Sequence, residues 1–254
     1  MSSGLHVVRA GVGPRLLMIH GSAADHTTWS IQLARGLKER FSLIAYERRA
    51  DAASIEEHAD DAVSVLGDDH TPAILVGSSF GAVVALEVLR RSGARCAGAV
   101  LIEPPMAPTD DMPAASSAFL AELDRTIATE GGPAAGALFL RTVLGETAYA
   151  RIPTAFLERS TAKWEQIRAD SVALTAYRPR YAELQAITTP VQLLGGEKSA
   201  SYFRPTLDAL FAALPDARLE IVPGAGHMLH AEAHRRFAEV VTQFAADIGV
   251  LRVP

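Results

Sequence analysis

Short apolar runs alternate with helical segments along most of this chain, and this alternation restricts the fold more than any other feature. Six runs of four to six residues are rich in apolar side chains, which predicts buried strands. They cover residues 16–20, 41–46, 73–76, 97–102, 191–194 and 218–222. The opening segment 5–10 alternates apolar and polar side chains, so we predict an edge strand there.

Segments with apolar residues at helical spacing lie between these runs, at 54–66, 80–91, 204–214 and 231–248. The first of them begins at Ser54 and has Glu57 three residues later, which is the pattern of a capping box. Strands that alternate with helices are typical of a mostly parallel sheet with helices on both faces. We therefore predict an α/β fold.

One stretch interrupts the alternation. Residues 104–186 contain no strand pattern, but they carry Ala-rich helical segments at 115–129, 133–144 and 153–177. This stretch is too long for a single connection between strands, because structureless loops seldom exceed about 15 residues. We predict a core made of residues 1–103 and 187–254, with a helical cap inserted at 104–186.

The composition excludes several classes of protein. Hydrophobic residues make up 49% and charged residues 21%, which is typical of a globular protein. The net charge of −5 and the scattered Lys and Arg argue against nucleic acid as a partner. No apolar run reaches the roughly 18 residues of a membrane span, and the first 14 residues lack signal-peptide features, so we expect no membrane partner. Cys96 is the only cysteine, which excludes an internal disulfide and suits a cytoplasmic protein.

The strongest chemical signal is G-S-S-F-G at 77–81, between a strand pattern and a helix pattern. Gly77-x-Ser79-x-Gly81 has the spacing of a nucleophile elbow, in which a sharp turn exposes the serine hydroxyl at the carboxyl end of the sheet. The small flanking residues let strand and helix approach, and the Phe80 amide would face the attacked group. Ser78 is less favoured because glycines do not flank it symmetrically. A tight turn with a capping serine is the alternative interpretation.

A serine nucleophile needs a base, and G-A-G-H-M at 224–228 supplies a candidate. These residues follow the last predicted strand, where a flexible loop can bring His227 to the serine. His230 and His234 follow at a spacing that leaves a metal site as an alternative, although no carboxylate or Cys completes a zinc pattern. We predict that these two histidines lie on a helix surface or at a helix start.

A third segment, H-G-S at 20–22, follows the first central strand. The Ser22 amide there would form an oxyanion hole together with the Phe80 amide. We expect His20 to hydrogen-bond the loop backbone. A plain strand–loop junction is the alternative.

The segments H-G-S, G-S-S-F-G and G-A-G-H resemble, in order and position, those of the α/β-hydrolase family. The resemblance covers nearly the whole chain and puts residues 104–186 at the family's usual cap position. It implies an eight-stranded, mainly parallel sheet and a Ser–acid–His triad, and we expect neither a cofactor nor a metal. The segment Y-E-R-R-A-D at 46–51 is similar to a family stretch that often reads D-x-R-G-x-G-x-S. We predict that it is scaffold, with Arg48 or Arg49 in an ion pair.

The acid of the triad departs from the family pattern. The loop that usually carries it reads L-G-G-E-K-S-A-S at 194–201, with Ser199 where the resemblance places an aspartate. A serine cannot orient a histidine and stabilise its charge as a carboxylate does. Glu103, at the end of the strand 97–102, is our preferred acid, and some relatives are similar in taking the acid from that strand end. Glu197 and the absence of any acid remain alternatives.

These observations predict a serine hydrolase that cleaves a carboxylic ester, lactone or thioester of a largely apolar small molecule through an acyl-enzyme. Two alternatives stay open: a lyase, C–C hydrolase or cyclase that uses His227 as acid and base, and a ligand-binding protein without activity. The sequence also leaves a homodimer open. The apolar residues expected near the substrate are Trp29, Met106, Phe119, Leu123, Phe139, Leu140, Phe156, Trp164 and Met228.

Overall fold

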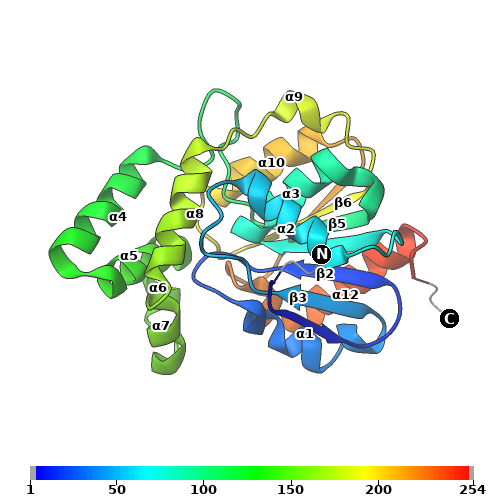
Figure 1. Cartoon of the computed structure of the whole chain (residues 1–254), viewed down its shortest axis with the longest axis horizontal. Coiled ribbons are helices and arrows are strands. Elements are labelled where there is room, and N and C mark those ends of the chain that lie inside the picture. The colour runs from blue at the N-terminus through cyan, green and yellow to red at the C-terminus, as the bar shows by residue number, and fades with distance from the viewer. Residues whose placement is uncertain (1–3, 252–254) are drawn as a thin grey trace.

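The computed structural model describes residues 4–251 and contains one mixed sheet flanked by helices (Figure 1). Its strands lie in the order β1-β3-β2-β4-β5-β6-β7. β1 is antiparallel to β3, and every other neighbouring pair is parallel. The strands are β1 (Val7–Ala10), β2 (Arg15–Ile19), β3 (Ser42–Tyr46), β4 (Ala73–Ser78), β5 (Cys96–Ile102), β6 (Val191–Gly196) and β7 (Ala217–Val222).

The predicted α/β fold is confirmed, including the edge strand at the start of the chain. The expected eight-stranded sheet is wrong, because the described residues 4–251 form seven strands. The eighth strand had come from the family resemblance alone, and only one strand pattern precedes the run at 16–20. β4 and β6 also continue past their apolar runs, because Gly and Ser at their ends keep the extended backbone without an apolar side chain.

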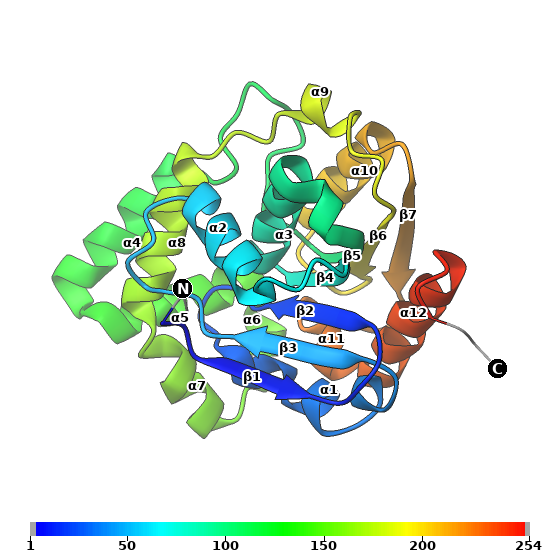
Figure 2. The same cartoon turned by 45° about the vertical axis from the view of Figure 1, so that its right-hand side comes forward.

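Helices cover both faces of the sheet, as Figure 2 shows for α2 and α3 against α1 and α12. Alternate strand residues point to opposite faces: Leu17 packs under α2, α3 and α10, and Leu16 packs under α1 and α12. The helices outside the insertion are η1 (His26–Trp29), α1 (Ser30–Ala34), η2 (Leu37–Glu39), α2 (Ile55–Leu66), α3 (Phe80–Ser92), η3 (Gly93–Arg95), α10 (Phe203–Ala213), α11 (Leu229–Glu232) and α12 (His234–Asp247). The predicted helix 231–248 is therefore split between α11 and α12.

Residues 104–186, which we call the helical insertion, connect β5 to β6, and most of them form a green to yellow-green group of helices beside the sheet in Figure 1. They contain α4 (Ser117–Glu130), α5 (Gly132–Leu144), α6 (Glu146–Tyr149), α7 (Thr154–Thr161), α8 (Trp164–Ala176) and α9 (Tyr181–Leu184). The insertion has an apolar cluster of its own, which includes Leu123, Leu140 and Ile167. No helix among residues 4–251 is both long and apolar enough to cross a bilayer.

The single helix expected at 153–177 is wrong, because α7 ends at Thr161 and α8 begins at Trp164. The end of α7 and the start of α8 each pack against a glycine of α5, and these two glycines lie one turn apart. A Cβ added to Gly136 would lie 2.7 Å from the Thr161 carbonyl oxygen, and one added to Gly132 would lie 2.2 Å from the Trp164 ring. Tertiary packing therefore breaks the helix at a place where the sequence has neither Gly nor Pro.

The carboxyl ends of the parallel strands meet at one edge of the sheet, and backbone hydrogen bonds hold the loops that leave it. The Ser79 amide, just after β4, donates to the Ile102 carbonyl at 2.8 Å. The Glu103 amide, just after β5, donates to the Leu194 carbonyl at 3.1 Å. This ladder brings the predicted nucleophile and acid to adjacent strand ends.

Candidate active site

Ser79 lies on a sharp turn between β4 and α3, in a backbone conformation that L-residues rarely adopt (φ 54°, ψ −122°). The turn requires glycine on both sides. A Cβ on Gly77 would lie 2.3 Å from the Gly81 carbonyl oxygen, and a Cβ on Gly81 would lie 2.2 Å from the Ile19 carbonyl oxygen. The strained serine between two obligatory glycines has the geometry of a nucleophile elbow.

The structure joins His227 to Glu103. The imidazole Nδ1 lies 2.6 Å from Glu103 Oε2, and the Gly196 amide donates to Glu103 Oε1 at 2.7 Å. A carboxylate only accepts hydrogen bonds, so Nδ1 carries the proton and Nε2 is left to accept one. Glu103 is buried and has a positive φ of 43°, which turns its side chain away from the strand direction. The Phe203 ring, which no sequence motif selected, stacks on the imidazole at 4.5 Å.

The alternative acid points elsewhere. Glu197 Oε2 accepts a hydrogen bond from the Gly224 amide at 2.7 Å, so this carboxylate fastens two neighbouring loops together. Ser199, at the position where the resemblance placed an aspartate, has a buried hydroxyl without a hydrogen-bond partner among the described residues. The geometry therefore favours Glu103 as the partner of the histidine.

Segment 20–22 lies against the serine. A Cβ on Gly21 would come within 3.0 Å of Ser79 Cβ, so Ser22 follows directly beside the elbow. Within residues 4–251, neither the Ser22 amide nor the Phe80 amide donates to a backbone carbonyl. Both are thus available to a ligand, and Phe80 adds the favourable field of the α3 N-terminus.

His20 hydrogen-bonds the loop backbone, as predicted. Its Nδ1–H donates to the Gly21 carbonyl at 2.9 Å, and its Nε2 accepts from the Arg48 amide at 3.2 Å. Burial, and next the Arg48 charge, lowers the pKa of His20 well below its usual value. The ring is therefore neutral at neutral pH, which this pair of hydrogen bonds requires.

Two cavities open beside Ser79, and both have walls from the helical insertion. The smaller, of about 40 Å³, is lined by both Ser79 and His227 and also by Met228. The larger, of about 270 Å³, shares Ser22 and Ser79 with it and is mostly apolar. Of the predicted substrate residues, the larger cavity contains Met106, Phe119 and Phe139, and the smaller contains Phe139, Leu140, Phe156 and Met228.

Three predicted substrate residues lie elsewhere. Trp29 is fully buried in the core, where its ring stacks on Phe237 at 6.2 Å on the face covered by α12. Trp164 packs over Gly132 between α8 and α5, and Leu123 is buried in the insertion's own apolar cluster. Large apolar residues are ordinary core material, so residue type alone did not separate packing from substrate contact.

The prediction that His230 lies on a helix surface or at a helix start is wrong in its burial. His230 is only 1% exposed, contacts the Trp29 ring at 4.9 Å and lines the smaller cavity. Neither ring nitrogen has a partner among the described residues. Burial, and next the neighbouring His227, lowers the pKa of His230 to about 3. His234 is the first residue of α12, as predicted.

The predicted ion pairs of Arg48 and Arg49 are both present. Arg49 contacts Asp61 at 2.7 Å near the surface. Arg48 is buried and contacts Asp170 of α8 at 2.7 Å, next to segment 20–22. Asp170 lies in the insertion, 122 residues further along the chain, and no motif in the sequence selected it.

Among residues 4–251, one group of side chains has the spacing of a metal site, namely Asp25, His26 and Glu47. These groups already have partners. Asp25 accepts from the Thr27 amide at 3.0 Å and contacts Lys163 at 3.3 Å, and His26 hydrogen-bonds Glu47. The contacts explain the cluster without an ion.

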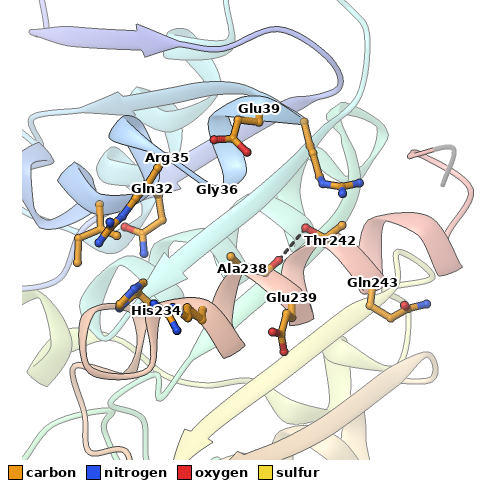
Figure 3. Close-up of a pocket in the computed structure, with 12 residues that line it drawn as sticks. Gln32, Arg35, Gly36, Glu39, His234, Ala238, Glu239, Thr242 and Gln243 are labelled. Carbon is orange, nitrogen blue, oxygen red and sulfur yellow. Dashed lines mark hydrogen bonds between the residues drawn. The ribbon is translucent and has the colours of Figure 1, made fainter. Parts of the chain in front are cut away.

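A more open cavity of about 570 Å³ lies on the other side of the core, between α1 and α12 (Figure 3). Charged side chains of both signs border it, among them Arg35, Glu39 and Glu239. None of the residues proposed for catalysis is among those that line it. We therefore place the candidate active site at Ser79.

The low pKa of His230 predicts an acid-sensitive fold. The unfolded chain takes up a proton at His230 near pH 6.5, and the folded chain does so only near pH 3. The stabilising contribution is therefore complete above about pH 6.5 and is lost as the pH falls towards 3, at roughly 1 kcal/mol per pH unit. The substitution His230→Phe removes this titrating imidazole. Urea unfolding should show a smaller loss of stability from pH 6.5 to 4.5 in the variant, and an equal loss in both proteins would contradict the assignment.

Comparison with solved structures supports the fold. A thermophilic esterase from Thermogutta terrifontis, solved with malate bound, matches with a TM-score of 0.80 and 21% identity over 96% of this chain and 93% of that one. An enzyme described as degrading N-acyl homoserine lactones matches with a TM-score of 0.75 and 20% identity over 96% of this chain and 98% of that one.

Two sequence comparisons add to this. A putative 2-succinyl-6-hydroxy-2,4-cyclohexadiene-1-carboxylate synthase from Bacillus subtilis (strain 168) is 34% identical over 68 residues. That match covers 27% of this chain and only 24% of the relative, so the chain aligns with about a quarter of the relative's length. A family model described as the alpha/beta hydrolase family matches residues 16–240. The chain therefore belongs to the α/β-hydrolase family.

Proposed function

We propose that this protein is a serine hydrolase that cleaves a carboxylic ester, lactone or thioester of a largely apolar small molecule through an acyl-enzyme. One observation carries the proposal: the buried hydrogen bond between His227 and Glu103 lies beside a strained Ser79 in the wall of one cavity. Family membership and the esterase and lactone-degrading neighbours agree with it.

Each group in the site has a distinct role in the proposed reaction. Ser79 Oγ attacks the carbonyl carbon while His227 Nε2 takes its proton, and Glu103 stabilises the imidazolium that results. The amides of Ser22 and Phe80 bind the negative charge that develops on the carbonyl oxygen, where one donor is worth about 3–4 kcal/mol. His227 then gives its proton to the leaving group, and a water that it activates releases the acyl group.

The two cavities support an orientation for the substrate. The leaving oxygen must lie next to His227, because that residue supplies its proton. His227 borders the smaller cavity, so the leaving group belongs there and the acyl chain belongs in the larger one. If a methylene group needs about the volume of a water molecule, roughly 30 Å³, a cavity of about 270 Å³ accepts an acyl chain of roughly six to nine carbons. In this proposal the helical insertion acts as the cap over the acyl chain.

A second candidate function rests on the match to the putative synthase from Bacillus subtilis. On the same scaffold His227 would act as acid and base in a lyase or cyclisation reaction, without an acyl-enzyme. The two functions differ in whether Ser79 becomes acylated.

The first prediction tests the nucleophile. A fluorophosphonate probe should label the wild type and Ser78→Ala but not Ser79→Ala, as measured by intact mass. With an activated ester in rapid mixing, the wild type should also release about one equivalent of alcohol in a burst before steady turnover. Labelling that persists in Ser79→Ala would refute the nucleophile. A wild type that is neither labelled nor able to turn over the ester would favour the second candidate function.

The second prediction tests the orientation with two isomeric esters, methyl octanoate and heptyl acetate. Methyl octanoate puts its long chain in the larger cavity, so its kcat/KM should exceed that of heptyl acetate by at least about tenfold, since each buried methylene contributes about 0.8 kcal/mol. Titration of the released carboxylic acid in a pH-stat measures both rates directly. An equal or reversed ratio would contradict the orientation but leave the acyl-enzyme proposal standing.

The third prediction identifies the acid. Glu103→Gln should lower kcat by roughly 10³-fold or more, because a neutral amide cannot stabilise the imidazolium. Glu197→Gln is the matched control, since its amide oxygen can still accept from the Gly224 amide. It should turn over the same ester at nearly the wild-type rate. The reverse result would assign the acid to Glu197.

A further inference from the structure

The Arg48–Asp170 ion pair joins the helical insertion to the core beneath the active site. Arg48 Nη1 lies 3.0 Å from Asp170 Oδ1 and Nη2 lies 2.7 Å from Oδ2, so the contact is bidentate. Arg48 is 4% exposed and Asp170 is 3% exposed. A buried ion pair contributes little net stability, because desolvation offsets most of the attraction. The role of this ion pair is therefore better explained by the other contacts of its two side chains than by its contribution to stability.

All five N–H donors of the Arg48 guanidinium have acceptors. Two go to Asp170, as above, and Nη1 also approaches His58 Nε2 at 3.4 Å. Nε donates to the His20 carbonyl at 3.1 Å, and Nη2 donates to the Gly21 carbonyl at 3.2 Å. The guanidinium is thus fixed in one orientation, with two of its donors on the segment that carries the proposed oxyanion donor.

Asp170 reaches the same segment directly. Ser22 Oγ donates to Asp170 Oδ2 at 2.6 Å. Since Arg48 holds the carbonyls of His20 and Gly21, the ion pair fastens every residue of segment 20–22. The insertion therefore bonds to the residue whose amide would bind the oxyanion.

Phe80, whose amide is the second proposed donor, contacts the same ion pair through its ring. The Arg48 guanidinium carbon lies 4.2 Å from the centre of the Phe80 ring, and His58 meets that ring edge-on at 5.2 Å. Phe80 is fully buried, so Arg48 covers the side chain whose backbone amide begins α3. One guanidinium thus contacts both Phe80 and segment 20–22, which carry the two proposed oxyanion donors.

The geometry points to Asp170 as a positioning residue through which docking of the helical insertion completes the oxyanion hole. With the insertion docked, Asp170 fixes Ser22 directly and orients Arg48, which fixes His20, Gly21 and the Phe80 ring. With the insertion displaced, Arg48 loses two of its acceptors and the Ser22 hydroxyl loses its own. The inference rests on the proposed hydrolase function for its effect on rate, but the positioning itself does not.

The test compares Asp170→Asn and Ser22→Ala with a matched control, Lys163→Met. Lys163 makes a different insertion–core ion pair, with Asp25 at 3.3 Å, and within residues 4–251 its side chain has neither a hydrogen bond nor an ion pair with segment 20–22. Asp170→Asn should lower kcat and the affinity for a trifluoromethyl ketone, which forms a charged adduct with the serine, by at least about tenfold with little change in KM. Ser22→Ala, which keeps its amide, should lose about threefold to tenfold. Lys163→Met should stay within twofold of the wild type.

Hydrogen exchange of the peptide that contains residues 20–22 supplies a readout without activity. Exchange there should rise in Asp170→Asn and Ser22→Ala but not in Lys163→Met. If Asp170→Asn does not fold, Ser22→Ala decides alone, because it removes only a hydroxyl. Unchanged exchange, or a kcat loss no larger than in the control, would overturn the inference. A wild type without ester turnover would refute the proposed function, and the exchange result would still decide the positioning.

Discussion

The close approach of α3 to the end of β2 is the constraint on which the rest of the site depends. The two elements are so near that a Cβ on Gly81 would lie 2.2 Å from the Ile19 carbonyl oxygen. This approach puts Ser79 at the sheet edge in a strained conformation and brings segment 20–22 against it. Backbone geometry therefore places Ser79 and brings segment 20–22 beside it, and the side chains of Arg48 and Asp170 then hold that segment in place.

The carboxylate beside His227 can come from more than one strand in this geometry. Neighbouring parallel strands end at the same edge, so either β5 or β6 can deliver a carboxylate to His227. Here β5 supplies Glu103, and the backbone after β6 supplies the Gly196 amide that holds its second oxygen. Glu197 instead accepts a hydrogen bond from the Gly224 amide. We infer that the acid has been relocated rather than lost, because both oxygens of the buried carboxylate are in use.

Much of the fold could be predicted from the sequence. The strands are short and mostly apolar, and the long core helices have apolar residues at helical spacing. The meeting of the histidine with Glu103 also followed, because strand ends of a parallel sheet converge. What the sequence could not show was packing between distant elements. Trp29 looked like a pocket residue, and only the position of α12 shows that it is core. Asp170 had no motif, and its role depends on how α8 lies over the sheet.

Two buried carboxylates lie near the serine, and every oxygen of both accepts a hydrogen bond. Glu103 follows β5 and orients His227, the proposed proton carrier. Asp170 comes from the helical insertion and orients the segment proposed to bind the oxyanion. Burying a carboxylate is costly unless it is paired or hydrogen-bonded: Asp170 is paired with Arg48, and Glu103 accepts a hydrogen bond at each oxygen. In the proposed mechanism the acid–base pair thus belongs to the core and the segment of one oxyanion donor contacts the insertion, so we expect movement of the insertion to affect stabilisation of the transition state more than the acid–base pair.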